Sequence, residues 1–453
     1  MLEMESESES GAQLSSRYAG SNRWWLDIAR RGTPWIEPSK PGHWKVTFFW
    51  RDPQGNEFTS ACQHVWINIT GKTDHHQTAL PQSLQRLTGT DVWFWQTDIE
   101  AGWRGSYSFM PVTESHPFIP PSDDPHANMM ALRHWWSDRF TTSTHDILNA
   151  HRSWSGGRGH RVSGLHMPDA LPQSVWRDFD NFATGCGRCT PAPPTLLQKQ
   201  QWHSPRLGNS RTVWVYTTGD SDPTSRPLAI LLDGQFWSQE MPVWEPLHQL
   251  TEQGKLPEAV YLLIEAIDIE HRSRELTCNA DFWLAVQEEL LPQLRVWAPY
   301  RDSPDTTLVA GQSFGGLSAL YACLHWPQTF GCALSQSGSF WWPQRQIQQA
   351  EPSEDQSGWL LRQIEQGVGQ AASLKIFMEA GVHERLIHRM NGELVKRLQQ
   401  TSHQLHYRDV VGGHDALCWR GGLMDGLAML WSPHFVVTTA AVREVEGVCD
   451  GKP

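Results

Sequence analysis

Positive charge, cysteine and long apolar runs are all scarce in this chain of 453 residues. It carries 37 Lys and Arg against 49 Asp and Glu, which gives a net charge of −12. A protein that neutralises phosphates normally shows a basic face, so this balance argues against a nucleic-acid partner. An anionic small molecule stays possible, because its recognition needs only a few local cations.

The apolar runs are too short for a membrane span. The longest, Leu228–Leu232 and Ala259–Ile264, have the length of a strand, whereas a span needs roughly 18 uninterrupted apolar residues. We therefore expect no membrane partner. The first residues, MLEMESESES, are acidic and polar and lack the basic start and apolar stretch of a secretory signal. A cytoplasmic location is the resulting expectation.

The 8 cysteines are scattered too thinly for a disulfide framework. Cys186 and Cys189 form a lone CxxC, and no second pair at zinc-ribbon spacing follows. We interpret them as incidental thiols and expect neither a metal site nor a cofactor. Tryptophan, in contrast, is abundant, with 25 residues. Most must serve packing because Trp buries a large area, and some could line a site for a flat aromatic ligand.

The N-terminal third reads as a small β domain. Residues 1–20 are rich in Glu, Ser and Gly without periodicity, which is typical of a disordered tail. Within 21–165, short alternating segments separated by turn signals predict an immunoglobulin-like β-sandwich. The predicted strands are 44–50, 64–70, 91–99 and 104–110. Residues 166–206 mix Pro, Gly and polar residues and are predicted to be a linker.

From residue 207 the pattern changes to apolar strands that alternate with helical segments. Strands at 211–216, 227–232, 259–266, 306–310, 332–335, 374–378 and 407–411 surround predicted helices such as 281–297 and 317–324. This alternation predicts a mostly parallel sheet with helices on both faces. We therefore expect a catalytic α/β domain over 207–435, followed by a tail over 436–453.

The strongest chemical motif is Gly311-Gln312-Ser313-Phe314-Gly315-Gly316. It follows an apolar strand and opens a helix, which is the context that a G-x-S-x-G nucleophile elbow requires and places the domain among α/β-hydrolases. The chain must turn within one residue, so side chains at 311 and 315 would collide. Ser313 is therefore the predicted nucleophile. The Phe314 N–H, at a helix N-terminus, is a predicted oxyanion donor.

The chain order of this fold, Ser then acid then His, selects the other catalytic residues. His414 is the predicted base, since it follows the strand 407–411 and precedes a helix, and its two preceding glycines would free the loop to aim the imidazole. Glu379 and Glu384 both follow the strand 374–378. We favour Glu384 in the loop as the acid and keep Glu379 open; Asp415 is a weak third candidate. Gln235, after the strand 227–232, is the predicted second oxyanion donor through its N–H.

Several longer segments carry a resemblance. LLDGQFW, IDIEHRSREL, VAGQSFGGLSALYACLHWP, LSQSGSFWWP and GGHDALCWRGGL, together with the N-terminal FFWRDPQGN, ITGKTDHHQ and GTDVWFWQT, resemble the enterobactin (enterochelin) esterases of enteric bacteria over roughly residues 40–435. The ends and the insert with Cys186 and Cys189 look additional. A wider circle of mycolyltransferases, feruloyl esterases and formylglutathione hydrolases shares only the C-terminal pattern.

The resemblance implies a cytoplasmic esterase that cleaves the trilactone of ferric enterobactin into dihydroxybenzoyl-serine units, so that iron is released. Iron would then enter as part of the substrate. The ferric complex is an anion with catecholate faces, so cations and aromatic rings are expected to bind it. The candidates are Arg272, Arg104, Arg158, Trp341 and Trp342, and Arg420 is a further candidate. For each Arg an ion-paired structural role is the alternative, and for the Trp pair it is core packing.

The same residues are also compatible with other functions. The same three catalytic groups would serve another ester or thioester, or acyl transfer instead of hydrolysis. A siderophore-binding protein with an inactive site is an alternative of another class, although an intact Ser, acid and His argue against it. Sequence leaves undecided the preference among cyclic, linear and glucosylated siderophores, and the oligomeric state.

Overall fold

The computed structural model describes residues 8–74, 76–77, 79–156, 159–182, 196–343 and 358–437. The chain divides into two compact units. The first contains Met1–Cys189 together with Val411–Cys418, and the second contains Thr190–Val410 together with Trp419–Pro453. Arg158, Cys186 and Cys189 lie outside the described residues.

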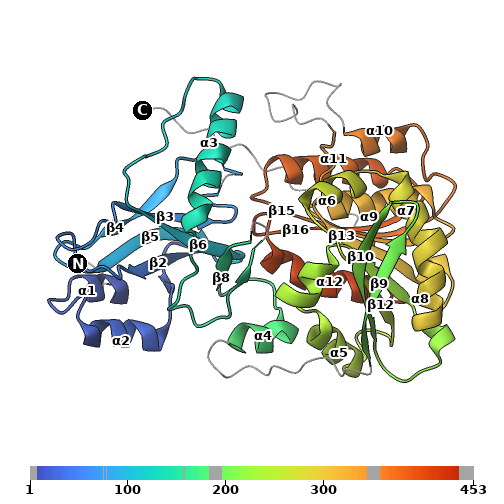
Figure 1. Cartoon of the computed structure of the whole chain (residues 1–453), viewed down its shortest axis with the longest axis horizontal. Helices are drawn as coiled ribbons and strands as arrows, with labels where there is room; N and C mark the ends of the chain where they lie inside the picture. Colours follow the sequence, from blue (N-terminus) through green and yellow to red (C-terminus); the bar gives the residue numbers. More distant parts are fainter. Residues whose placement is uncertain are drawn as a thin grey trace. The chain divides into compact units, whose positions relative to one another are not determined.

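The first unit is built on one antiparallel sheet of eight strands in the order β1-β2-β5-β4-β3-β6-β8-β7 (Figure 1). Its buried face carries large apolar side chains such as Phe48, Ile67, Trp103 and Phe109. The strands are β1 (Trp35–Pro38), β2 (His43–Arg51), β3 (His64–Ile69), β4 (Gln82–Arg86), β5 (Val92–Glu100), β6 (Arg104–Val112), β7 (Trp154–Ser155) and β8 (Arg161–His166). The four predicted strands are present. The hydrogen bonds form one continuous order of strands, so the predicted two-sheet sandwich is not confirmed.

Part of the predicted disordered tail is ordered. Helix α1 (Glu9–Leu14) begins after Ser8, whose hydroxyl accepts from the Gly11 N–H at 3.2 Å. The N–H of Ser10 donates to Glu37 on β1 at 3.1 Å and is buried there. Composition alone suggested disorder, because the partner that orders this segment lies 27 residues further along the chain. Helices α2 (Asn22–Arg31), α3 (Pro125–Arg139) and α4 (Arg177–Asn181) complete the unit.

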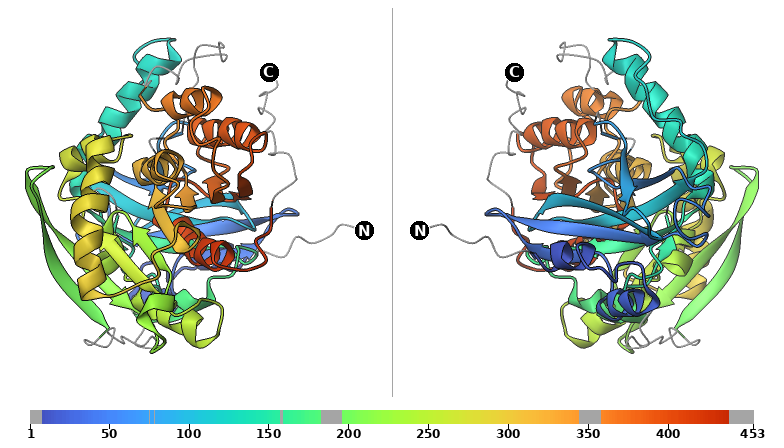
Figure 2. Two further views of the ribbon diagram at one scale, coloured as in Figure 1. Left: turned by 90° about the vertical axis from the view of Figure 1, so that its right-hand side faces the viewer. Right: turned by 90° about the vertical axis from the view of Figure 1, so that its left-hand side faces the viewer.

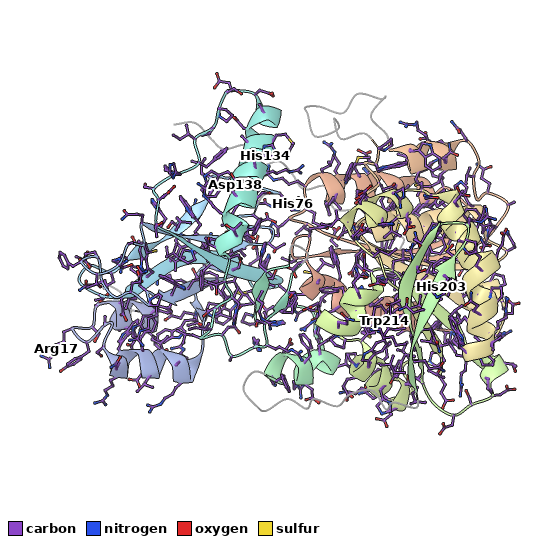
Figure 3. The ribbon with its side chains drawn as sticks, in the orientation of Figure 1. Arg17, His76, His134, Asp138, His203 and Trp214 are labelled. Carbon is purple, nitrogen blue, oxygen red and sulfur yellow. The ribbon has the colours of Figure 1, made fainter. Side chains whose placement is uncertain are left out.

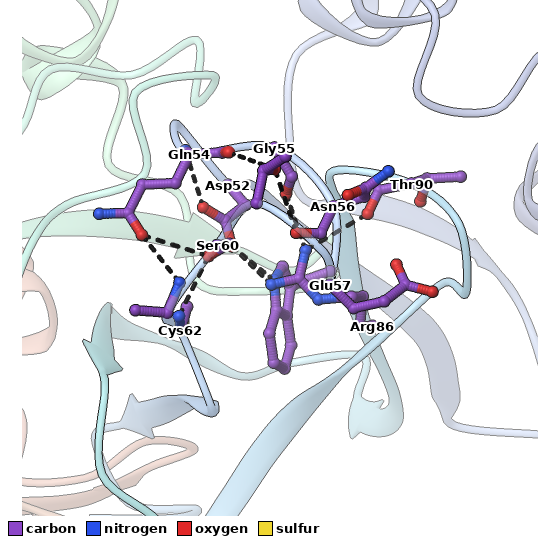
Figure 4. A network of polar contacts seen from close by, with 12 residues as sticks. Asp52, Gln54, Gly55, Asn56, Glu57, Ser60, Cys62, Arg86 and Thr90 are labelled. Carbon is purple, nitrogen blue, oxygen red and sulfur yellow. Dashed lines mark hydrogen bonds and ion pairs between the residues drawn. The ribbon is translucent and has the colours of Figure 1, made fainter.

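A buried carboxylate fixes the turn that follows β2. Asp52 accepts hydrogen bonds from the Ser60 hydroxyl at 2.6 Å and the Gln54 N–H at 2.9 Å (Figure 4). Arg86 reaches the same carboxylate at 2.6 Å and donates to the Gly55 carbonyl at 2.8 Å. Burial acts to raise the pKa of Asp52, but these hydrogen bonds outweigh it and hold that pKa below its usual value.

The second unit contains a mixed sheet of eight strands in the order β16-β15-β14-β13-β11-β12-β10-β9. β9, β10 and β12 pair in antiparallel fashion, and all the other pairs are parallel. The strands are β9 (Leu197–Ser204), β10 (Asn209–Thr217), β11 (Leu228–Leu231), β12 (Val260–Ile264), β13 (Thr307–Gln312), β14 (Cys332–Gln336), β15 (Lys375–Gly381) and β16 (Gln404–Val410). Each predicted strand is present, and the five central ones are almost wholly buried, as in a sheet covered on both faces.

Helices cover both faces of this sheet (Figures 1 and 2). They are α5 (Trp244–Glu252), α6 (Ile269–Glu275), α7 (Ala280–Ala285), α8 (Leu291–Trp297), α9 (Phe314–His325), α10 (Trp359–Glu365), α11 (Leu386–Leu398) and α12 (Ala416–Leu430). The predicted helix over 281–297 is interrupted by a π-helical turn, Val286–Leu290. No helix among the described residues combines the length and apolar character that a membrane span requires.

The predicted linker over 166–206 overlaps this sheet. Its last residues form β9, which pairs along its whole length with β10 at the sheet edge. His203, on the edge strand β9, and Trp214, on its neighbour β10, are labelled in Figure 3. β9 is rich in Gln and Lys, a polar composition that edge strands tolerate because one side faces solvent, so its sequence resembled a loop.

Candidate active site

Ser313 lies at the bend between β13 and α9, as the elbow motif predicts. Its backbone has φ 58° and ψ −118°, a conformation that L-residues rarely adopt. The bend is crowded: a Cβ atom at Gly311 would lie 2.3 Å from the Gly315 carbonyl oxygen. Because Phe314 is the first residue of α9, its N–H has no acceptor within the helix. A partly exposed hydroxyl therefore stands beside a donor that can stabilise an anion.

The segment that follows β14 connects the nucleophile to the favoured acid. The Ser313 N–H donates to the Gln336 carbonyl at 3.0 Å, and the Ser313 and Ser339 hydroxyls are 3.2 Å apart. The Ser337 hydroxyl donates to Glu384 Oε2 at 2.8 Å and accepts from Trp419 Nε1 at 2.9 Å. Ser313 and Glu384 thus both make polar contacts with the short segment 336–339 of the second unit.

Glu384 occupies the loop between β15 and α11 and is buried. Besides Ser337, its Oε2 accepts from the Gly381 N–H at 2.6 Å. These donors hold the carboxylate in one orientation, which is what an acid that orients a histidine requires.

Glu379, the competing candidate, lies within β15 and is 1% exposed. Arg408 donates to one of its oxygens at 2.8 Å and Gln336 donates to the other at 2.5 Å. Burial raises the pKa of Glu379 above its usual value, although Arg408 and Gln336 lower it. Arg408 also pairs with Asp425 at 2.8 Å. Both oxygens of Glu379 therefore serve an ion-pair network under the sheet edge, which favours Glu384 as the acid.

Gln235 lies in the tight turn that follows β11. Asp233 opens the turn with φ 54°, and the Gln235 side chain accepts from the Ala266 N–H at 2.9 Å, which ties the turn to the end of β12. Arg272 of α6 donates twice to Asp233, at 2.6 and 2.8 Å, and once to the Gln312 carbonyl at 3.3 Å. Arg272 therefore lies beside the elbow with its charge paired, and the geometry points to a structural contribution.

We expect Arg272→Gln to destabilise the turn that carries Gln235. Asp233 would keep a mostly buried carboxylate, 14% exposed, without its cation, at a cost of about 1–3 kcal/mol after discounting for the partly exposed arginine. Ester hydrolysis should fall about 10-fold or more because an oxyanion donor shifts. Thermal melting and kcat measure these effects, with Arg206→Gln, which removes a solvent-exposed pair, as the control.

The double variant Arg272→Gln, Asp233→Asn should recover part of the lost stability, because it removes both partners of the pair. If Arg272→Gln leaves the melting temperature unchanged and raises KM for the anionic substrate alone, the structural role of Arg272 is contradicted. Such a result would support the predicted role in substrate binding.

His414 lies between β16 and α12, as predicted, in the segment Val411–Cys418 that groups with the first unit. Its ring is 5.6 Å from the ring of His76. We predicted that the preceding glycines free the loop. Neither Gly412 nor Gly413 has a positive φ, and a Cβ atom at Gly413 would lie 2.6 Å from the Gly71 Cα. The requirement is close backbone approach, which corrects the predicted reason for these glycines.

Asp74 is a fully buried carboxylate near this histidine. Burial raises the pKa of Asp74 to about 6, while hydrogen bonds from Gly71, Gln77 and His76 and the charge of His414 act to lower it. The folded protein therefore keeps the Asp74 proton at a pH where the unfolded chain, with a usual value of 3.8, has lost it. The contribution of Asp74 to the free energy of unfolding consequently falls as the pH rises from about 4 to about 6.

Asp74→Asn should remove this pH dependence. Relative to the unsubstituted protein, the variant should be more stable at pH 7 than at pH 4. The gain corresponds to about 2–3 kcal/mol in the free energy of unfolding, for a shift of two pKa units, and should appear as a higher relative melting temperature. Differential scanning calorimetry at both pH values measures the change. The same melting difference at pH 4 and pH 7 would show that Asp74 ionises normally.

The other predicted substrate residues have structural contacts. Arg104 is 8% exposed and donates to His166 Nδ1 at 2.9 Å and the Leu171 carbonyl at 2.6 Å. Arg420 is fully buried. Trp341 and Trp342 are partly buried against the core, and the Trp341 ring lies 5.9 Å from that of Phe314, next to the nucleophile. Substrate binding by these residues stays a prediction, as it does for Arg158.

Sequence reasoning missed two serines that the structure places in these networks. Ser337 contacts Glu384, and Ser106 contacts Asp415. Ser337 could have been suspected from its place directly after the strand that neighbours the elbow strand. No pattern in the sequence around Ser106 predicts a partner 309 residues away. Both oxygens of Asp415 are occupied, by Ser106 and by the Leu417 N–H, which fits its low rank as a candidate acid.

Comparison with known proteins matches both halves of the chain. Residues 45–176 match the family "Enterochelin esterase, N-terminal" and residues 204–430 match the family "Putative esterase". The iron(III) enterobactin esterase of Escherichia coli (strain K12) is 50% identical over 422 residues, which are 93% of this chain and 99% of that protein.

Solved structures agree with these matches. The ferric enterobactin esterase of Salmonella typhimurium superposes with a TM-score of 0.80 at 50% identity and covers 91% of this chain and 98% of its own. The enterobactin esterase of Shigella flexneri, solved in the presence of enterobactin, gives a TM-score of 0.77 at 49% identity, with the same coverage.

These matches and the two-unit α/β structure define the class of the protein, which is a carboxylic ester hydrolase. The identity extends through both units and not only through the part with the nucleophile elbow. Within that class, the chain belongs to the iron(III) enterobactin esterase family.

Proposed function

We propose that this protein hydrolyses the seryl ester bonds of ferric enterobactin and so allows its iron to be released. The observation that carries the proposal is the 50% identity to an iron(III) enterobactin esterase over 93% of the chain, which includes the residues that match the enterochelin esterase N-terminal family. Cleavage opens the trilactone that preorganises three catecholates around the iron. Iron is therefore part of the substrate, and the reaction needs no resident cofactor.

In the proposed mechanism, Ser313 is the nucleophile, His414 the base and Glu384 the acid. The Ser313 hydroxyl attacks an ester carbonyl while His414 accepts its proton. The Phe314 and Gln235 N–H groups stabilise the oxyanion. His414 then returns the proton to the leaving seryl hydroxyl, and water, activated by the same histidine, releases the acyl group as a carboxylate. Each cycle consumes one water, and three cycles yield dihydroxybenzoyl-serine.

The arrangement of the second sheet supports a finer assignment of this unit as an α/β-hydrolase domain. Its antiparallel edge strands, parallel centre and elbow after β13 fit that fold. For the first unit the immunoglobulin-like sandwich stays a prediction. We also propose a cytoplasmic location, where a small-molecule substrate would be the partner and nucleic acid would not.

A product time course on ferric enterobactin tests the proposed function. We expect the cyclic trilactone to give the linear trimer, then the dimer, then the monomer, as separated by liquid chromatography. Methyl esters of simple acids should be cleaved far more slowly. Binding without any product, in a preparation that also fails on other esters, would favour the alternative of a siderophore-binding protein.

A product carrying a second acyl acceptor in place of water would instead indicate acyl transfer. Running the same course with the iron-free and glucosylated siderophores would establish the preference that the sequence leaves undecided.

A further inference from the structure

The segment Val411–Cys418 belongs by its contacts to the first unit, although β16 of the second unit leads directly into it. Arg104, the first residue of β6, holds both of its ends. The Arg104 N–H donates to the Val411 carbonyl at 3.1 Å, and the Arg104 carbonyl accepts from the Cys418 thiol at 3.1 Å. Gln173 also donates to the Leu417 carbonyl at 2.8 Å. The histidine of the proposed mechanism is therefore carried on a loop that the N-terminal unit holds.

Asp415, the residue after His414, makes the central contact. It is 4% exposed, and its Oδ2 accepts from both the N–H of Ser106, at 2.8 Å, and the Ser106 hydroxyl. Its Oδ1 accepts from the Leu417 N–H at 2.7 Å. A carboxylate with three donors forms charge-assisted hydrogen bonds, which are stronger than neutral ones and more directional. Asp415 thus joins the histidine loop to β6.

The two glycines of the loop are equally confined. A Cβ atom at Gly412 would lie 2.8 Å from the Arg104 carbonyl oxygen, and Gly413 packs on Gly71 of the loop that follows β3. His76 of that same loop lies beside the His414 ring. The loop therefore packs closely on the start of β6 and on the turn after β3, both of which belong to the first unit.

We propose that Asp415 and Ser106 are positioning residues for His414, because their hydrogen bonds fix the loop that carries the proposed catalytic base. This inference rests on the proposed function, since it takes His414 as the group that activates Ser313. Displacement of a reacting group by about 1 Å can cost about 100-fold in rate. β6 thereby contributes to the chemical step through the loop that carries His414.

Asp415→Asn is the sharpest test. An amide can still accept from Leu417 through its oxygen, but its NH2 group cannot accept from Ser106. We expect kcat on ferric enterobactin to fall about 10–100-fold while KM changes little. The rate at which a fluorophosphonate labels the nucleophile should fall by the same factor, because that reaction needs the base but not the siderophore.

Asp146→Asn is the matched control. Asp146 is a buried carboxylate of the same unit and also has three donors. It accepts from the hydroxyls of Thr33 and Tyr107 and from the Leu148 N–H. Its donors all lie outside the histidine loop. We expect a comparable loss of melting temperature but an unchanged kcat at temperatures where both variants are folded.

Ser106→Ala and Ser106→Thr provide a second route if Asp415→Asn fails to fold. Alanine should lower kcat several-fold, and threonine, which restores the hydroxyl, should return most of it. Equal kcat and labelling rates for Asp415→Asn and Asp146→Asn, or for Ser106→Ala and the unsubstituted protein, would overturn the positioning role. Full activity of His414→Ala would instead refute the proposed mechanism itself, so the two failures are distinguishable.

Discussion

Ser313→Ala is expected to abolish hydrolysis of ferric enterobactin, with kcat reduced by about 10⁴-fold or more. This hydroxyl is the proposed nucleophile, and it lies at the strained bend, with φ 58°, between β13 and α9. The fold should be retained, because the hydroxyl's one described contact is the 3.2 Å approach to Ser339. The variant should still bind the ferric siderophore, as monitored by quenching of tryptophan fluorescence.

Ser318→Ala is the control for this experiment. Ser318 lies on the same helix, is fully buried and accepts from Trp283 Nε1 at 3.0 Å. Its loss should lower the melting temperature and leave kcat within a few-fold of the original. Cleavage by Ser313→Ala at the original rate would show that the nucleophile has been assigned to the wrong residue.

The second large effect is expected from Glu384→Gln, which should lower kcat by about 10³–10⁴-fold. A neutral amide cannot stabilise the imidazolium that forms when His414 accepts the Ser313 proton. The surrounding hydrogen bonds from Ser337 and Gly381 can still be accepted by the amide oxygen, so we expect the variant to stay folded. Kinetics at saturating substrate measure the loss.

Glu379→Gln separates the two candidate acids. It leaves Arg408, which is 23% exposed, with Asp425 as its remaining acid partner, so we expect a lower melting temperature and a kcat within about 10-fold of the original. A larger loss of turnover from Glu379→Gln than from Glu384→Gln would reverse the assignment. The comparison is made at temperatures well below both melting transitions, so that unfolding does not contribute to the difference.

Local sequence patterns were reliable wherever the reason for a structure lies within a few residues. The elbow at Ser313 is such a case, since two glycines, an apolar strand and a helix are all contained in about fifteen residues. The buried strands of the second sheet could be predicted in the same way. β9 could not be predicted, because its polar residues lie at a sheet edge. α1 could not be predicted either, because Glu37 orders it from a distant strand.

The sequence by itself determined the class of chemistry, ester hydrolysis, and predicted the order of the groups proposed to perform it: a serine at a cramped bend, an acid after β15 and a histidine after β16. These follow from local sterics and from the fixed succession of strands and helices. Only the tertiary structure decided which carboxylate is committed elsewhere, since Arg408 reaches Glu379 from the neighbouring strand. It also decided that the loop carrying His414 groups with the N-terminal unit. The Ser106 N–H donates to Asp415, which lies 309 positions further along the chain, a separation that no local pattern records.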